Sequence, residues 1–243
     1  MSPTAELPCR ITVVFDNLAY ANDLTTSWGF AAVIECRGET VLFDTGGVGG
    51  ILLDNLHALD FDPSSFQHVV ISHAHDDHYG GVGALAASGV QASLYLFPRI
   101  EQQLSGVALA GLTPVQVEAG MEIVPGIATT GMVGAAIPEQ ALIVQTSQGL
   151  VVVTGCAHPG VVEMVQAAKA LFDDEVYLVM GGFHLGRASD AVIQETIAGL
   201  QSLGVQHVAP SHCTGERAIA LFEQRYGDGF IPSGLGRVIE IEP

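Results

Sequence analysis

The stretch Ser72-His73-Ala74-His75-Asp76-Asp77-His78 places three imidazoles and two carboxylates in six consecutive positions. It follows the apolar run from His68 to Ser72, which predicts a short buried strand. Because side chains alternate along a strand, the first two histidines point to the same side and can reach one ion at Zn–N distances of about 2.0–2.1 Å. The turn after them can direct Asp77 and His78 to a neighbouring space, so the spacing favours two ions.

Two histidines do not complete a catalytic zinc site, which takes three protein ligands and leaves one position for water. Three distant histidines, His158, His184 and His212, each follow a predicted strand and have Gly or Pro nearby. Such neighbours allow sharp turns and a close approach to a ligand, as in loops gathered at one edge of a sheet. We therefore take these three as candidate ligands. The histidines without such a loop are interpreted as ordinary structural residues: His57, His68 and His207.

Three further residues are candidates, each with an open alternative. Asp44, in Phe43-Asp44-Thr45-Gly46, either caps a turn or accepts the outer N–H of a metal-bound histidine and orients its ring. Trp28 either packs in the core or lines the mouth of a substrate pocket. Arg187 is either a surface charge or a partner for an anionic substrate. The sequence alone leaves each of these choices open.

Hydrophobic periodicity divides the chain into two similar halves. Each half begins with strands paired by short turns and continues with helices that alternate with strands. This pattern predicts two sheets packed face to face with helices outside, a four-layer αββα sandwich of the mixed α/β class. A doubly wound parallel sheet is the plainer alternative, but the adjacent strand pairs argue against it. Strands are expected at 10–15, 29–36, 40–44, 68–72, 92–97, 113–117, 127–130, 141–146, 150–154, 175–180, 207–209 and 237–241, and helices at 48–59, 80–88, 160–171, 191–203 and 216–226.

The composition sets limits on the partners. The chain has 243 residues, of which 49% are hydrophobic and 14% charged, and no linker interrupts it, so residues 1–243 are expected to form a single domain. A formal charge of −18 would repel nucleic acid and anionic membranes, which leaves a small-molecule substrate as the expected partner. Without an apolar run of about 20 residues or a signal peptide, a cytoplasmic location is expected. The four cysteines lack paired spacing and are expected to be free thiols.

These motifs resemble the metallo-β-lactamase superfamily in its hydrolase branch. Asp44-Thr45-Gly46 looks like its first motif, residues 73–78 look like its signature, and His158 and His212 look like its later ligand motifs. A narrower resemblance is to the group similar to the dihydropterin ribofuranosylaminobenzene phosphate synthase of methanopterin biosynthesis. The segments that carry it are Trp28-Gly29-Phe30, His75 to Gly81, Gly155-Cys156-Ala157-His158-Pro159-Gly160, Gly181-Gly182-Phe183-His184-Leu185 and His212-Cys213-Thr214-Gly215.

The resemblance implies one or two divalent ions, with zinc as the first choice and manganese or iron as alternatives. The superfamily usually has an aspartate that bridges the ions at the end of a late strand, where this chain reads Gly181-Gly182-Phe183-His184. No carboxylate stands there, which makes His184 a candidate ligand or substrate contact. The implied ligands are His73, His75 and His158 for one ion, and Asp77, His78 and His212 for the other.

The hypothesis for function is a metal-dependent hydrolase. A metal-bound water that loses a proton near neutral pH would attack an ester-like or phosphoester-like bond of a small molecule, with Asp77 and His184 as catalytic residues. Two alternatives stay open: a di-iron redox protein of the same fold, and a non-enzymatic metal-binding sensor. Metal analysis with a visible spectrum distinguishes the first alternative, and a screen for hydrolysis distinguishes the second.

Overall fold

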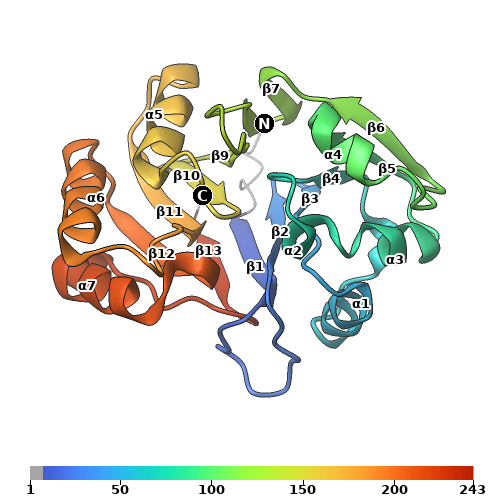
Figure 1. Cartoon of the computed structure of the whole chain (residues 1–243), viewed down its shortest axis with the longest axis horizontal. Helices are drawn as coiled ribbons and strands as arrows, with labels where there is room; N and C mark the ends of the chain where they lie inside the picture. Colours follow the sequence, from blue (N-terminus) through green and yellow to red (C-terminus); the bar gives the residue numbers. More distant parts are fainter. Residues whose placement is uncertain (1–7, 243) are drawn as a thin grey trace, which may run out of the picture.

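Two mixed β-sheets packed face to face form the centre of the protein (Figure 1). The computed structural model describes residues 8–242. The first sheet has the strand order β13-β1-β2-β3-β4-β5-β6, and the second has the order β12-β11-β10-β9-β8-β7. The strands are β1 Cys9–Asp16, β2 Phe30–Cys36, β3 Glu39–Phe43, β4 His68–Val70, β5 Ala92–Leu96, β6 Leu112–Gln116, β7 Ala119–Val124, β8 Ile127–Gly131, β9 Leu142–Thr146, β10 Gly149–Thr154, β11 Val176–Gly182, β12 His207–Ser211 and β13 Val238–Ile241.

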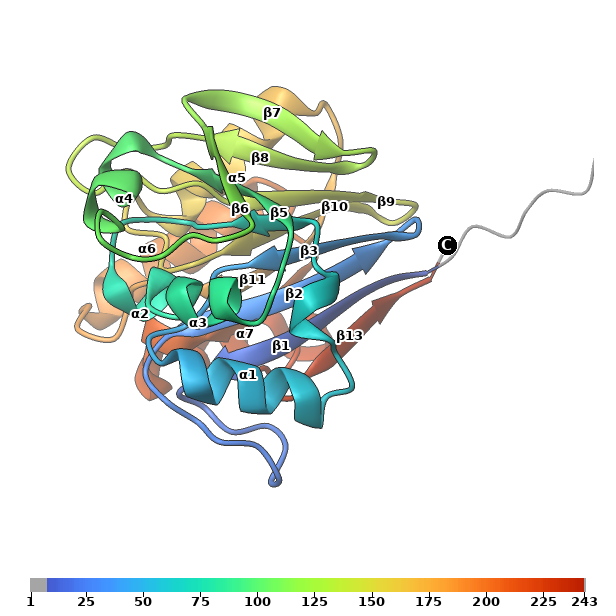
Figure 2. The ribbon, with the colours of Figure 1, turned by 90° about the vertical axis from the view of Figure 1, so that its right-hand side faces the viewer.

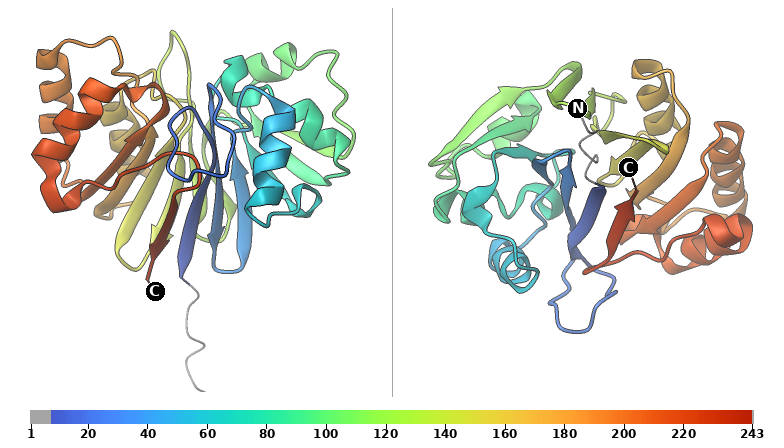
Figure 3. Two further views of the ribbon diagram at one scale, coloured as in Figure 1. Left: turned by 90° about the horizontal axis from the view of Figure 1, so that it is seen from below. Right: turned by 180° about the vertical axis from the view of Figure 1, so that it is seen from behind.

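Helices cover the outer face of each sheet (Figure 3). Helices α1 to α4 belong to the side of the first sheet, and α5 to α7 to the side of the second. Their bounds are α1 Gly49–Ala58, α2 Asp76–Tyr79, α3 Val82–Ala87, α4 Pro98–Gln103, α5 Val161–Leu171, α6 Asp190–Ser202 and α7 Glu216–Tyr226, with 3-10 turns η1 Pro63–Ser65, η2 His212–Thr214 and η3 Gly227–Gly229. Within residues 8–242, no helix has both the length and the apolar character needed to cross a membrane.

Strand β10 shows why the central strands are apolar throughout. Val151 and Val153 pack in the core between the two sheets. Leu150 and Val152 point the other way, into a second core beneath α5 and α6. A strand that is buried on both faces needs apolar side chains at every position. In a strand with one solvent-exposed face, apolar and polar side chains alternate. This double burial produces the run Leu-Val-Val-Val at 150–153.

The predicted αββα sandwich is confirmed, and the doubly wound alternative is wrong. Antiparallel pairs β1/β2 and β2/β3 precede the parallel strands of the first sheet, and β8/β9 and β9/β10 do the same in the second. Besides the 3-10 turns, two helices and one strand were not predicted, namely α2, α4 and β7. Most side chains of β7 are exposed or partly exposed, so it lacks the apolar pattern that reveals a strand. Strand β4 ends at Val70, two residues before the predicted end.

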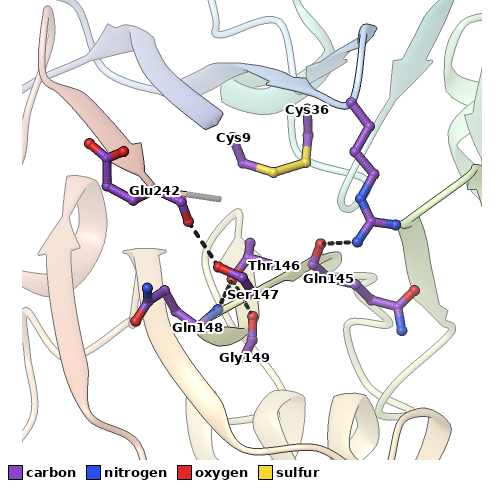
Figure 4. Close-up of a disulfide and its surroundings, with 9 residues drawn as sticks. Cys9, Cys36, Gln145, Thr146, Ser147, Gln148, Gly149 and Glu242 are labelled. Atoms are coloured by element: carbon purple, nitrogen blue, oxygen red, sulfur yellow. Dashed lines mark hydrogen bonds between the residues drawn. A yellow bond between two sulfur atoms is a disulfide. The ribbon is translucent and has the colours of Figure 1, made fainter. Parts of the chain in front are cut away.

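The prediction that all four cysteines are free is wrong, because Cys9 and Cys36 form a disulfide (Figure 4). Strands β1 and β2 pair antiparallel with Arg10 opposite Glu35, which brings the two cysteines opposite each other with Cα atoms 4.2 Å apart. The pairing depends on strand register and not on spacing along the chain, so the sequence pattern did not reveal it. Cys156 and Cys213 are free, as predicted.

Candidate metal centre

The candidate metal centre lies at one edge of the sandwich, where the ends of strands from both sheets meet. Parallel strands open to the same edge, and ligands typically bind in the crevice outside their carboxyl ends. In the first sheet β3 and β4 are parallel, and residues 72–78 follow β4. In the second sheet β10, β11 and β12 are parallel and lead into Gly155, Phe183 and His212. Figure 2 shows α2, which carries part of the cluster, at the edge away from the C-terminal end of β13.

Unusual backbone conformations gather at this edge. Asp44, Ala157, His184 and His212 have φ values of 59°, 56°, 53° and 50°. Among described residues other than glycine, two more have positive φ, both away from this edge. Such left-handed conformations cost on the order of 1–3 kcal/mol each and persist only where the surroundings impose them. The fold therefore concentrates backbone strain at the loops that carry the candidate ligands.

The first set of candidate ligands is His73, His75 and His158. The Nε2 atom of His73 and the Nε2 atom of His158 lie 3.0 and 3.1 Å from Nδ1 of His75. The rings stand edge to face, each pair with centroids 4.7 Å apart. An isolated bridge to Glu139 keeps the chain extended at His73 beyond the end of β4. Three nitrogen atoms thus face a common space from two loops 83 residues apart.

Asp44 and Ser72 determine which nitrogen of His73 is free. The carboxylate of Asp44 accepts the backbone N–H of Ser72 at 2.6 Å and its hydroxyl at 2.7 Å. Since the Ser72 hydroxyl gives its hydrogen to Asp44, its oxygen accepts from Nδ1–H of His73 at 2.9 Å. The Nε2 atom of His73 is then left with a lone pair that points into the centre. Fixing the tautomer through the outer nitrogen is how proteins orient metal-binding histidines.

The second set is Asp77, His78 and His212. Asp44 Oδ2 accepts Nδ1–H of His78 at 2.7 Å, and Asn17 Oδ1 accepts Nδ1–H of His212 at 2.7 Å. The inner Nε2 atoms of these histidines lie 3.7 and 3.5 Å from Oδ2 of Asp77. The Nε2 atom of His212 is buried and has no hydrogen-bond partner in the structure. A buried nitrogen without a partner is costly, so this atom fits a role as a ligand.

The first set is held in the neutral form that a metal requires. Burial and the neighbouring imidazoles keep the pKa of His73 well below its usual value. Burial, together with His184 and His75, lowers the pKa of His158 to about 4. Neutral imidazoles with facing lone pairs repel one another unless something positive lies between them. The first set therefore fits a cation.

The second set is arranged to stabilise positive charge. Burial lowers the pKa of His78, but the charge and hydrogen bond of Asp44 outweigh it and raise the pKa to about 9. Burial raises the pKa of Asp77, yet the neighbouring His212 and His78 hold it well below the usual range. Imidazole nitrogens with a carboxylate are donors that zinc, manganese and iron accept. The residues present therefore fit a divalent cation here as well.

Glu139 is the residue that sequence analysis missed. Its side chain is fully buried, and burial raises its pKa although backbone N–H groups and His78 oppose the shift. Its Oε1 accepts the backbone N–H groups of Gly155, Cys156 and Ala157 at 2.8–3.1 Å, and its Oε2 accepts that of His158 at 3.0 Å. One carboxylate thus shapes the whole turn that carries His158. No local motif marks Glu139, because its contacts are with backbone atoms 16–19 residues away.

His184 and two free thiols lie beside the two ligand sets. The exposed ring of His184 lies 4.2 Å from that of His158, and the neighbouring Cys213 raises its pKa. Ligand atoms of Cys156, His184 and Cys213 all lie within 4.8 Å of one another. The thiol of Cys213 donates to the carbonyl oxygen of Cys156 at 3.7 Å. His184 therefore stands at the rim, beside the first ligand set rather than inside it.

An apolar pocket of about 260 Å³ opens beside His75. Its wall is mostly hydrophobic, with Arg99 as the cation and Glu118 as the carboxylate among the residues that line it. The position next to a candidate ligand suits a substrate-binding pocket. Sequence analysis missed these residues because the pocket is built by packing between distant loops. The lining comprises Ala74, His75, Phe97, Pro98, Arg99, Glu118, Met132, Ile137 and Pro138.

Trp28 and Arg187, the predicted substrate contacts, do not line this pocket. The Trp28 side chain is 59% exposed, so core packing is not its role, and its ring lies 5.0 Å from that of His212. It therefore borders the second ligand set. Arg187 is exposed and has no hydrogen bond or ion pair in the described structure. The structure brings the six predicted ligands and Asp44 together, and it leaves Arg187 at the surface.

Comparison with known proteins bears on the class of the protein. Residues 29–95 match the sequence model of the metallo-β-lactamase superfamily. The chain is 27% identical to the 7,8-dihydropterin-6-methyl-4-(β-D-ribofuranosyl)-aminobenzene-5'-phosphate synthase of Methanocaldococcus jannaschii, over 94% of this chain and 95% of that protein. Together with the αββα fold, these matches confirm the resemblance to the metallo-β-lactamase superfamily.

Solved structures agree with this class. Tm1679, a metal-dependent hydrolase of the β-lactamase superfamily, superposes with a TM-score of 0.81 at 28% identity, covering 97% of this chain and all of that one. A diphosphatase from the PhnP family superposes with a TM-score of 0.65 at 12% identity, over 97% of this chain and 98% of that one. The second likeness concerns the fold alone. The protein therefore has a hydrolase-like metallo-β-lactamase fold with a candidate centre for divalent metals.

Proposed function

We propose that the protein is a metal-dependent hydrolase that cleaves an ester-like or phosphoester-like bond of a small molecule. The observation that carries the proposal is the convergence of two ligand sets, one with three imidazoles and one with two imidazoles and a carboxylate, beside an open apolar pocket. Divalent cations bound there would lower the pKa of a water molecule to about 7 and polarise the bond to be cleaved.

Two side chains would take part in the proton transfers of the reaction. The carboxylate of Asp77 lies beside His78 and His212 in the second ligand set, where it could accept a hydrogen bond from the attacking water and orient it. The imidazole of His184 stands exposed beside His158, where it can donate a proton to the leaving group. Replacing His184 with Gln is then expected to lower kcat by about 10²–10⁴-fold and to leave metal content unchanged.

The pocket beside His75 suggests what the substrate looks like. Its apolar wall suits a hydrophobic or aromatic part, and Arg99 can pair with an anionic group. The pocket is too small for a macromolecule, so a small molecule is the proposed substrate. Replacing Arg99 with Met is expected to raise KM for an anionic substrate and to leave KM for a neutral one unchanged.

Metal removal tests the proposal directly. Protein stripped with a chelator is expected to lose hydrolysis of generic phosphodiesters, lactones or thioesters and to regain it with zinc, manganese or iron. His75→Ala should lose at least 100-fold in kcat/KM. His57→Ala, at an exposed position on α1, is the matched control and should retain full activity. Equal hydrolysis by metal-free and metal-loaded protein would contradict the proposal.

A synthase activity is a second candidate, favoured by the likeness to the M. jannaschii enzyme over nearly the whole of both chains. The name of that enzyme specifies a product with a 5'-phosphate. In this chain Arg99 is the cation that lines the pocket and could bind such a group. A competition experiment tests whether the pocket accepts such molecules. If it does, an aryl compound that carries ribose 5-phosphate should inhibit hydrolysis, and Arg99→Met should abolish that inhibition.

A further inference from the structure

Cys156 lies where the two ligand sets meet. Its side chain is 4% exposed, and its sulfur lies 3.3 Å from Nε2 of His78. Its Sγ and ligand atoms of His73 and His158 lie within 4.8 Å of one another, and the same holds for Cys156, His78 and His212. One sulfur atom is therefore within reach of both sets. Two ligands of one tetrahedral zinc ion lie about 3.3–3.6 Å apart, given Zn–S and Zn–N distances of about 2.3 and 2.0–2.1 Å.

We infer that the thiolate of Cys156 is a shared ligand that bridges the two cations. The inference rests on the proposed function only in taking both ligand sets as metal sites. On coordination the thiol loses its proton to solvent, and the sulfur forms one bond to each cation without any change of oxidation state. A bridging anion also reduces the repulsion between two neighbouring dications. No carboxylate fills this place, since β11 ends in Gly181-Gly182.

The surroundings hold Cys156 in this position. Its backbone N–H is fixed by Oε1 of Glu139 at 2.9 Å. A Cβ atom at Gly155 would overlap Ser72, and one at Gly182 would overlap the carbonyl oxygen of Gly155 and lie 3.2 Å from Cα of Cys156. The turn is therefore closely packed between Ser72 and Gly182. A residue other than glycine before Cys156 would push the sulfur away from the imidazoles.

One further observation points to a cation between these groups. The Nε2 atom of His212, in the same cluster as Cys156, is fully buried and has no partner. Cys213 is the other thiol nearby, but it donates to the carbonyl oxygen of Cys156, whereas the Cys156 sulfur faces His78. The two thiols thus have different environments, and Cys213→Ser serves as the matched control for Cys156→Ser.

X-ray absorption at the zinc edge of the zinc-loaded full-length protein tests the inference. With two zinc ions bound, a bridging sulfur gives about one sulfur scatterer per zinc at about 2.3 Å, next to nitrogen and oxygen at about 2.0–2.1 Å. A sulfur bound to one ion gives about half a scatterer per zinc, and this result overturns the bridge. This measurement on the unmodified chain needs no variant to fold.

The variants then show which cysteine supplies the sulfur ligand. Cys156→Ser should lose the sulfur signal and bind the second zinc ion at least 10-fold more weakly, while Cys213→Ser should keep both. In the cobalt form, the thiolate-to-cobalt absorption band should be absent from Cys156→Ser alone. If two zinc ions bind and hydrolysis proceeds without a sulfur signal in the unmodified protein, the inference fails and the hydrolase proposal stands. If none of zinc, manganese and iron binds, the proposed function fails with it.

Discussion

Asp44 and Glu139 are two buried carboxylates behind the candidate centre, and they support it in different ways. Asp44 binds side chains directly, since it accepts from His78 and from Ser72, which in turn orients His73. Glu139 binds four successive backbone N–H groups and so shapes the turn from Gly155 to His158. Asp44 thus sets the tautomers of ligands on the first half of the chain, and Glu139 sets the path of the backbone on the second.

The difference shows how one metal centre is assembled from two halves. In the first half the ligands are close together in sequence, so the backbone brings them near one another and only ring orientation remains to be fixed. In the second half the turn at 155–158 has to approach ligands far away in sequence, so its backbone needs support. We therefore expect loss of Glu139 to act mainly on folding and loss of Asp44 to act mainly on metal affinity.

The largest effect is expected for Glu139→Ala. It leaves three buried N–H groups and one partly buried N–H group without an acceptor, and at about 1 kcal/mol or more for each group the free energy of unfolding should fall by roughly 4 kcal/mol. Urea unfolding of the metal-free protein measures the change. Glu139→Gln can keep the oxygen that accepts three of these groups and should lose less. A change below about 1 kcal/mol in the alanine variant would show that Glu139 does not shape the turn.

Gly155→Ala tests the contact between the two halves. A Cβ atom at this position would overlap Ser72 and lie 3.0 Å from Oδ2 of Asp44, so the free energy of unfolding should fall by roughly 2–3 kcal/mol. Thermal and urea unfolding measure it. Gly50→Ala is the control, because a Cβ atom there meets nothing within 4 Å in α1 and should stabilise the helix by about 0.5–1 kcal/mol. Equal effects of the two substitutions would refute the close approach.

Asp44→Asn is expected to weaken zinc binding by about 10–100-fold, because the neutral amide orients and polarises His78 less well. Competition with a coloured chelator measures the affinity. The free energy of unfolding of the metal-free protein should change much less than in Glu139→Ala. Asp44 does not act mainly on metal affinity if the free energy of unfolding of Asp44→Asn falls strongly while its zinc affinity stays normal.

Ser72→Ala should have the smallest effect. It removes one hydroxyl that links Asp44 to Nδ1 of His73, which should cost about 1 kcal/mol in stability and a few-fold in zinc affinity. Isothermal titration of zinc and urea unfolding measure the two quantities. In a double variant with Asp44→Asn the losses should not add, because both changes break the same chain of hydrogen bonds. Additive losses would mean that Ser72 acts independently of Asp44.

The sequence predicted the parts of the centre whose pattern is local. Residues 73–78 stand out by density, and His158 and His212 stand out because they follow strand ends near Gly or Pro. Asp44 could be named as a candidate because it follows a strand and precedes Thr45-Gly46. In each case the position of the residue after a strand places its side chain at the edge of a sheet. The local sequence pattern is therefore enough to predict where the side chain lies.

Features that depend on tertiary contacts could not be predicted. Glu139 acts through backbone atoms of another loop, and Arg99 reaches the pocket through packing. The disulfide between Cys9 and Cys36 follows from strand register. The side chains of strand β7 are mostly exposed or partly exposed, so the strand lacks the apolar pattern of the central strands. These features share one cause, because each depends on which segments meet in the folded chain.

The most direct test of the account is anomalous diffraction at the zinc edge from crystals of the zinc-loaded protein. We expect one peak among His73, His75 and His158 and a second among Asp77, His78 and His212. Side chains that keep their positions around two such peaks would support the centre described here. Zinc bound elsewhere, with these nitrogen atoms left without a metal, would contradict it.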